Sequence, residues 1–395
     1  MKRSSLGLKL PEGMRDLLPD ELARLEDFER QALTVCYNWA YQKVLTPGLE
    51  YRACVEPDAD KDDNLYKLFD KKGRILVLRP EFTTPIARLV ANRQKEETFP
   101  QRYCYSGDVY RNDSDRFKEF RQLGVELVGS HADLADGEVI ALAVEIARTL
   151  NFNKFQLRLG HNGIFSGLAR ELKFDEELRR QLEDEISRKN MVKLERTIEQ
   201  SSLSADVKEL LFSMPHLTGG EEVLDKLQTW GHIEAIAEAA ESLRNIFRYL
   251  QHFGVKKEVT VDLGILRGFS YYTGVIFEGY LPGIGIPILE GGRYDRLYAD
   301  FGLNHPATGW AMNLGLISEY QAGPEKEATM ILVYGESVEK VIKHCRELRE
   351  SGHQVEMALE DLTPQEAEQL AKEKGLKHVV RVEKDERKKV CLDKS

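Results

Sequence analysis

The sequence predicts an α+β protein that carries a helical insertion and ends in a small α/β domain. Short runs of β-branched and aromatic residues, broken by glycine and proline, fill residues 41–126 and return from residue 259. Leucine, glutamate and arginine dominate residues 164–250, and this composition favours helices. After residue 327, strand-like and helix-like segments alternate. The 395 residues, of which 42% are hydrophobic, are enough for two or three domains with a sizeable core.

The first predicted element is a long amphipathic helix. Asp20 follows Pro19 and is a suitable N-cap, and apolar residues then recur at helical spacing as far as Tyr41. The β-rich region that follows contains two clear strand candidates, at residues 74–78 and 103–105. We therefore expect one helix and then a group of strands in the first third of the chain.

A helical insertion and a second group of strands complete the larger predicted domain. The insertion is placed at about residues 164–250, and residues 176–199 are its clearest helical part. Residues 259–263 and 271–278 predict strands. The glycine-dense stretch 279–292 is typical of a turn between antiparallel strands.

A polar joint at residues 321–327 predicts a domain boundary, with a core at 1–322 and a small α/β domain at 327–395. Thr363 and Glu366 form a capping box with proline at the first helical position. The expected elements of this domain are a strand at 329–333, a helix at 338–349, a strand at 354–359, a helix from the capping box onward and a strand at 378–382.

Composition excludes several classes of function. There are 66 acidic and 56 basic residues, a net charge of −10, so nucleic acid or an anionic membrane would need a local basic patch that the sequence does not supply. No run of about 18 apolar residues is present, and no signal peptide is recognisable. Five cysteines without a CxxC pair fit reduced thiols of the cytosol, so we expect a cytoplasmic protein without a metal.

The common catalytic and nucleotide-binding signatures are absent. The sequence has no Walker A loop, no zinc-protease helix and no GxSxG elbow. What remains is a set of charged and polar residues within strand-like surroundings: Arg79, Glu81, Arg111, Arg116, Glu119, Gln122, Glu126 and Arg267. Gln122 and Glu126 are four residues apart, so a regular strand presents both on one face. Each residue alone is explained as well by a rim position or an ion pair, whereas together they indicate a pocket.

Several segments resemble the core of histidyl-tRNA synthetase, a class II aminoacyl-tRNA synthetase built on an antiparallel sheet flanked by helices. The match covers nearly the whole chain. The similar segments are residues 10–16 near the N-terminus, the first helix running into 45–47 as motif 1, 110–126 as motif 2, 267–273 as the histidine signature, and 291–295 with 309–312 before motif 3. Motif 1 serves dimerisation in that family.

The resemblance implies a pocket for L-histidine. Glu81 and Gln122 hold the α-amino group, Glu126 and Tyr272 hold the imidazole, Tyr271 belongs to the same tyrosine pair, and Arg267 lies by the carboxylate. An amino-acid zwitterion with a titratable ring needs acceptors for its N–H groups and a cation for its carboxylate. The resemblance also implies that Arg111, with Arg116 in the motif 2 loop, belongs to the ATP site.

The synthetase pattern is broken around that ATP site. Leu316 stands where the family has the arginine that binds the γ-phosphate. The motif 2 loop at 112–115 is short and carries two acids, and Ser270 replaces an acidic residue. Adenylyl transfer depends on fixed cations around the polyphosphate, so we expect a vestigial ATP site, no catalytic residues and no cofactor.

A synthetase-like core with this change resembles the regulatory subunit family of ATP phosphoribosyltransferase. That resemblance implies a short-form catalytic subunit as partner, L-histidine as feedback inhibitor at the first step of histidine biosynthesis, and a homodimer within a larger hetero-oligomer. Residues 325–395 hold 14 basic and 16 acidic side chains, a net of −2, which argues against a tRNA-binding surface. Two alternatives stay open: an active histidyl-tRNA synthetase, and a free-standing histidine sensor for another partner.

Overall fold

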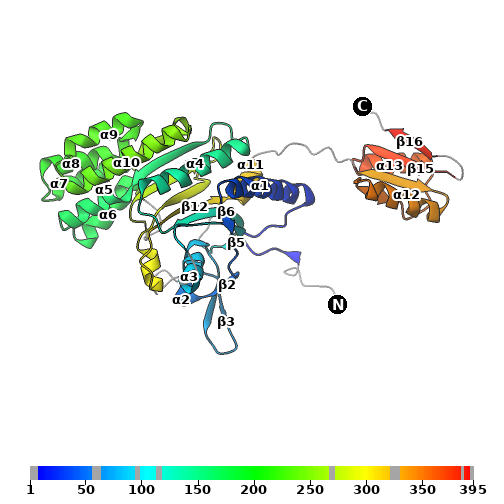
Figure 1. The fold of residues 1–395 in the computed structure, drawn as a ribbon, viewed down its shortest axis with the longest axis horizontal. Coiled ribbons are helices and arrows are strands. Elements are labelled where there is room, and N and C mark those ends of the chain that lie inside the picture. Colours follow the sequence, from blue (N-terminus) through cyan, green and yellow to red (C-terminus); the bar gives the residue numbers. More distant parts are fainter. Residues whose placement is uncertain are drawn as a thin grey trace. The chain divides into compact units, whose positions relative to one another are not determined.

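The computed structural model describes residues 8–55, 64–93, 98–112, 118–266, 272–320, 330–383 and 387–391. The chain forms two compact units, Met1–Gln321 and Ala322–Ser395 (Figure 1). Within the described residues, no helix has both the length and the apolar composition needed to cross a membrane.

A nine-stranded sheet organises the larger unit, in the order β1-β5-β6-β12-β11-β10-β7-β9-β8. All neighbours pair antiparallel except β1 with β5 and β7 with β9. The strands are β1 (Gln42–Lys43), β5 (Gln101–Tyr110), β6 (Glu119–Val128), β7 (Gln156–His161), β8 (Thr218–Gly219), β9 (Val259–Asp262), β10 (Val275–Tyr280), β11 (Leu289–Arg293) and β12 (Ala307–Asn313). This sheet, with its flanking helices, confirms the predicted α+β class.

Two details of the β-rich regions differ from the sequence prediction. The strand expected from residue 271 begins at Val275, and residue 271 itself lies outside the described residues. The glycine-dense stretch is only partly a turn, because Gly291 and Gly292 lie within β11. Both glycines sit where the sheet is crowded: a Cβ atom on Gly291 would lie 2.5 Å from the ring of Phe277, and one on Gly292 would lie 2.7 Å from the Val275 carbonyl oxygen.

Helix α1 (Pro19–Asn38) packs its apolar face into the main core through Leu25, Phe28 and Cys36. The predicted N-cap was wrong, because Leu18 is the N-cap and Pro19 the first helical residue. The side chain of Glu21 instead accepts a hydrogen bond of 3.1 Å from the Leu18 backbone N–H. The helix also ends before Tyr41, which follows the left-handed residue Ala40 (φ 63°).

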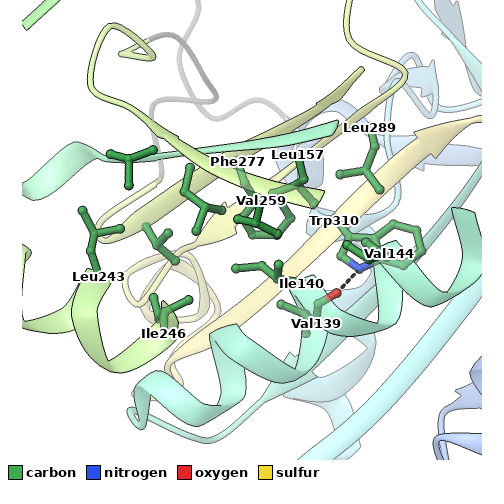
Figure 2. Close-up of a cluster of buried hydrophobic side chains, with 14 of the residues drawn as sticks. Val139, Ile140, Val144, Leu157, Leu243, Ile246, Val259, Phe277, Leu289 and Trp310 are labelled. Atoms are coloured by element: carbon green, nitrogen blue, oxygen red, sulfur yellow. Dashed lines mark hydrogen bonds between the residues drawn. The ribbon is translucent and has the colours of Figure 1, made fainter. Parts of the chain in front are cut away.

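Helix α4 (Asp133–Thr149) covers β6 and β12 and packs against α1 and α10 (Glu234–His252). Its core contact is centred on Trp310 of β12, whose indole N–H donates a 2.8 Å hydrogen bond to the carbonyl of Val139 (Figure 2). Leu157, Phe277 and Leu289 belong to the same buried cluster. The helix and the middle of the sheet are therefore joined by apolar packing and by this buried hydrogen bond.

The larger unit also contains a smaller three-stranded sheet of order β2-β4-β3, whose strands precede β5 in the chain (Figure 1). Helix α3 follows it and packs through Ile86 and Val90 in a second core cluster with Tyr105 and Tyr298. The elements are β2 (Leu49–Tyr51), α2 (Arg52–Val55), β3 (Lys67–Phe69), β4 (Ile75–Leu78) and α3 (Thr83–Arg93). The turn from β4 to α3 carries Glu81.

The helical insertion follows β7 in the chain and ends before β9. Its helices gather in one group, drawn in green in Figure 1. The side chain of Asp175 caps α6 by accepting a 2.8 Å hydrogen bond from the Leu178 N–H. The helices are α5 (Asn162–Glu171), α6 (Glu176–Ser187), α7 (Met191–Gln200), α8 (Ala205–Ser213), α9 (Glu221–Leu227) and α10 (Glu234–His252). Helix α11 (Leu314–Tyr320) then ends the described part of the larger unit.

The smaller unit has the predicted alternation of strands and helices, in a sheet of order β14-β13-β15-β16. The predicted capping box is confirmed, since the Thr363 N–H donates to Glu366 at 2.8 Å and the Glu366 N–H donates to Thr363 at 3.3 Å. A fourth strand was not predicted. The elements are β13 (Ile331–Gly335), α12 (Val338–Glu350), β14 (Val355–Met357), α13 (Pro364–Glu373), β15 (His378–Val382) and β16 (Arg387–Cys391).

Candidate functional site

A cavity of about 320 Å³ lies on one face of the large sheet, over β6, β12 and β11. The turn before α3 and the start of α11 form part of its walls. Its lining residues are Glu81, Thr83, Arg111, Phe120, Gln122, Glu126, Tyr272, Ile286, Pro287, Ile288, Glu290, Tyr294, Gly309, Trp310, Ala311, Asn313 and Leu316.

Small residues occupy paired positions on neighbouring strands at the cavity, and one of them, Gly309, lines it. Glu126 of β6 pairs with Gly309 of β12, which pairs with Gly292 of β11. A Cβ atom on Gly309 would lie 2.2 Å from Glu126 Oε2 and 2.3 Å from the Val125 carbonyl oxygen. A Cβ atom on Gly292 would lie 2.9 Å from the ring of Tyr272. Glycine is therefore needed at both positions for the two side chains to stand where they do.

Glu126 is the least exposed polar residue of the described lining, at 1%. Its Oε1 accepts a 2.8 Å hydrogen bond from the Thr83 hydroxyl, whereas Oε2 has no partner among the described residues. Burial raises the pKa of Glu126 well above its ordinary value; the bond from Thr83 opposes this and the charge of Glu81 adds to it. A buried acceptor without a partner is costly, so this oxygen is suited to a ligand N–H.

Two further acceptors lie beside Glu126. Both carboxylate oxygens of Glu81 accept from the Thr84 backbone N–H at 3.1 Å, which fixes the side chain at the start of α3. Burial raises the pKa of Glu81, against the effects of the Thr84 bonds and of Arg111. Gln122 lines the cavity from β6, and its buried Oε1 has no hydrogen-bond partner in the described part of the chain. These three side chains form the acceptor end of the cavity.

Within the described part of the lining, the cation is Arg111. Its Nε–H donates a 2.8 Å hydrogen bond to the Pro80 carbonyl, and its guanidinium carbon lies 5.5 Å from the centre of the Phe120 ring. Leu316 lines the same cavity, and its backbone N–H donates to Asn313 Oδ1 at 2.9 Å. The position that the resemblance assigns to the γ-phosphate contact is thus an apolar part of the wall.

Tyr272 closes one side of the cavity. Its backbone carbonyl accepts a 2.5 Å hydrogen bond from the Asn162 amide, and its ring centre lies 6.3 Å from that of Tyr294. Burial raises the pKa of its phenol, and the carboxylates of Glu290, Glu126 and Glu81 add to this. The hydroxyl is therefore held protonated among acceptors.

The structure brings together five of the residues predicted for the site: Glu81, Gln122, Glu126, Tyr272 and Arg111. Arg267, Tyr271 and Arg116 lie outside the described residues. Two candidates do not line the cavity. Arg79 is buried; its Nη1–H donates to the Thr46 carbonyl at 2.6 Å, and its guanidinium lies over the ring of Phe82. Glu119 interacts with Tyr110 instead: burial, together with a hydrogen bond with Glu119, raises the pKa of Tyr110 to about 12. These two have structural roles.

Sequence reasoning missed four polar lining residues, Thr83, Glu290, Tyr294 and Asn313. Glu290 directly precedes the Gly291–Arg293 segment, and the period of two along a strand places it on the same face as Gly292. The described residues contain no group of three or more His, Cys, Asp or Glu side chains able to hold a metal ion.

The chain is similar to proteins of known name over nearly its whole length. A family model described as histidyl-tRNA synthetase matches residues 13–317. The ATP phosphoribosyltransferase regulatory subunit of Desulfitobacterium hafniense (strain Y51) is 50% identical over 380 residues, covering 96% of this chain and 99% of the relative. The protein so named in Moorella thermoacetica is 38% identical over 381 residues, covering 94% and 98%. The chain belongs to the ATP phosphoribosyltransferase regulatory subunit family.

Solved structures agree with membership of the regulatory subunit family. The structure from Bacillus halodurans C, described as an ATP phosphoribosyltransferase regulatory subunit/histidyl-tRNA synthetase, is 31% identical with a TM-score of 0.86 and covers 98% of this chain and 100% of that one. Histidyl-tRNA synthetase from Nostoc sp. PCC 7120, at 23% identity, has a TM-score of 0.82 over 97% of both chains and shows the shared fold. The predicted resemblance and the class II fold are confirmed.

Proposed function

We propose that this chain is the non-catalytic regulatory subunit of an ATP phosphoribosyltransferase and that L-histidine occupies the cavity. The observation that supports this most strongly is the pair of buried acceptors without partners among the described residues, Glu126 Oε2 and Gln122 Oε1. Partnerless buried acceptors beside a second carboxylate suit a ligand that brings several N–H donors. Histidine brings an ammonium group and a ring N–H.

In the proposed complex, each polar group of histidine has a side chain that can form a hydrogen bond or an ion pair with it. The ring N–H donates to Glu126 beside Tyr272, and the ammonium group donates to Glu81 and Gln122. The carboxylate lies by Arg267, as the family resemblance implies. By the same resemblance, Arg111 belongs to the vestigial ATP site; its Nε–H donates to the carbonyl of Pro80, the residue before Glu81.

Feedback inhibition follows if occupancy of the cavity changes the conformation of a catalytic partner. A ligand shifts such an equilibrium only by its difference in affinity for the two states, typically about 1–3 kcal/mol. We propose a short-form catalytic subunit as that partner, in the cytoplasm, within a hetero-oligomer that involves no nucleic acid.

The deciding experiment mixes the purified chain with a short catalytic subunit and measures phosphoribosyl transfer to ATP with and without L-histidine. Activity that requires the chain and falls with histidine supports the proposal. If the chain binds histidine but does not change the activity of the catalytic subunit, a free-standing histidine sensor for another partner becomes the better explanation.

The pH dependence of binding should follow the raised pKa of Glu81. An ammonium group donates to the ionised carboxylate, so protons compete with the ligand as the pH falls through this pKa. In the protein without ligand, the raised pKa of Glu81 stabilises the folded state at low pH, and this stabilisation is lost as the pH rises through that pKa. The increase in melting temperature caused by histidine should therefore grow with pH across this window. Glu81→Gln should reduce that growth, and an unchanged profile would place the ammonium elsewhere.

We expect no histidine-dependent exchange of pyrophosphate into ATP and no charging of tRNA. The wall at Leu316 offers no cation for the γ-phosphate, and loss of one such contact can lower a rate by about 100-fold or more. Leu316→Arg alone should not restore exchange, because the motif 2 loop also differs. Robust charging by the unmodified chain would instead identify an active histidyl-tRNA synthetase.

We also expect a homodimer as the smallest unit in solution. On helix α1, Leu22 is 38% exposed and Tyr37 is 50% exposed, whereas the other face of the helix is buried. The resemblance assigns this helix to a two-fold contact between subunits. Closed two-fold symmetry is the commonest arrangement of soluble homo-oligomers. Sedimentation at micromolar concentration tests this. A monomer with intact histidine binding would show that α1 serves only the core of its own subunit.

A further inference from the structure

Among the lining residues that the structure describes, Glu290 is the one carboxylate that does not belong to the acceptor end of the cavity. It lies on β11, where it pairs with Ala311 of β12 on one side and with Glu278 of β10 on the other. Its side chain lies on the same face of the sheet as Gly292 and lines the cavity, so it is open to solvent through the cavity although protein surrounds it. Among the described residues it forms neither a hydrogen bond nor an ion pair within contact distance, so the fold itself does not require an acid here.

The position is electrostatically unfavourable for a carboxylate. Like charges directly opposite each other on antiparallel strands destabilise a sheet, and Glu278 is such a neighbour. Burial raises the pKa of Glu290, while the charge of Arg111 lowers it. Glu290 thus shares the cavity with Arg111 and reduces the positive potential that the arginine presents to a ligand.

We infer that Glu290 is a specificity-determining residue that keeps phosphate-bearing ligands out of the cavity. This inference rests on the proposed function and deepens it, because it explains how a histidine site would reject histidine derivatives and nucleotides that carry phosphate. A phosphate that approaches Arg111 meets Glu290 as well, in a cavity where the described lining has three acids against one arginine. Leu316 removes an attraction for phosphate, whereas Glu290 adds a repulsion, which is how selective sites discriminate against a competitor.

The test compares L-histidine with L-histidinol phosphate, which keeps the imidazole and the amine but carries a phosphate ester in place of the carboxylate. Calorimetry on the full chain gives both dissociation constants for the wild type, Glu290→Gln and Glu278→Gln. Glu278→Gln is the matched control, since it removes the other acid of the cross-strand pair and lies outside the cavity lining. We expect Glu290→Gln to reduce the preference for histidine roughly tenfold or more, through tighter binding of the phosphate ester. The control should keep the wild-type preference.

A second arm uses MgATP and thermal shift, with Glu290→Ala as a further variant in case the glutamine variant folds poorly. Both Glu290 variants should gain protection by ATP that the wild type lacks. Unchanged affinities for both phosphate ligands would overturn the inference, and so would an equal gain in Glu278→Gln, which would indicate a general effect of net charge. If the wild type fails to bind histidine, the proposed function fails, but the ATP arm still decides the role of Glu290.

Discussion

Replacing Glu126 by alanine is expected to weaken L-histidine binding by roughly 1.5–3 kcal/mol, the usual contribution of a hydrogen bond that involves a charged group. The expected cause is local, because Glu126 Oε2 is the buried acceptor that we assign to the ring N–H, and the Thr83 hydroxyl would also lose its acceptor. Calorimetry of the purified variant measures the loss directly.

The matched control is Glu119→Ala, which removes a carboxylate from the same strand but outside the cavity lining. Its histidine affinity should equal that of the wild type. Glu126→Gln adds a finer test, since it keeps the shape and one acceptor oxygen while removing the charge. If Glu126→Ala binds histidine as tightly as the wild type, the imidazole must lie elsewhere.

Replacing Arg293 by alanine is expected to destabilise the larger unit by about 3–5 kcal/mol, because it leaves a buried carboxylate without its cation. Arg293 is 9% exposed in its side chain and its partner Asp136 is 1% exposed, with 2.9 Å between them. The same guanidinium donates to the carbonyls of Ser130 and Ala132 at 2.9 and 3.2 Å. It therefore ties the end of β11 to the segment before α4.

Denaturant unfolding followed by circular dichroism measures this change. Arg296→Ala, an exposed arginine three residues further along, should change the free energy of unfolding by less than about 0.5 kcal/mol. Arg293→Lys should recover only part of the loss, because an ammonium group does not have the planar fork of a guanidinium. A wild-type stability in Arg293→Ala would mean that Asp136 is neutral or solvated in the folded protein.

The α+β class and the shared face of one pair of lining residues were predictable from local sequence. The strand period places Gln122 and Glu126 on one face, and this holds in β6. Element ends were less predictable: Leu18 replaces Asp20 as the N-cap because proline at the first helical position fixes where α1 begins. The strand β16 was missed because Arg387, Lys388 and Lys389 have weak strand propensity, so its pairing with β15 decides its conformation.

The composition of the site was harder to predict than its location. Arg79 and Glu119 have the same character in the sequence as the lining residues, but the three-dimensional arrangement gives them other partners. Glu290 was missed because a single acid before a glycine pair has no distinctive pattern. It becomes significant only when the register of β10, β11 and β12 is known.

The glycine at the base of the cavity has a consequence for how the family can diversify. Gly309 already has the smallest possible side chain, so no substitution at this position can deepen the cavity, and any substitution there makes it shallower. Larger ligands can be admitted by smaller side chains at other lining positions, such as Thr83, Tyr294 or Leu316. Changes of ligand among descendants of this fold should therefore be recorded at those positions, while Gly309 stays constant.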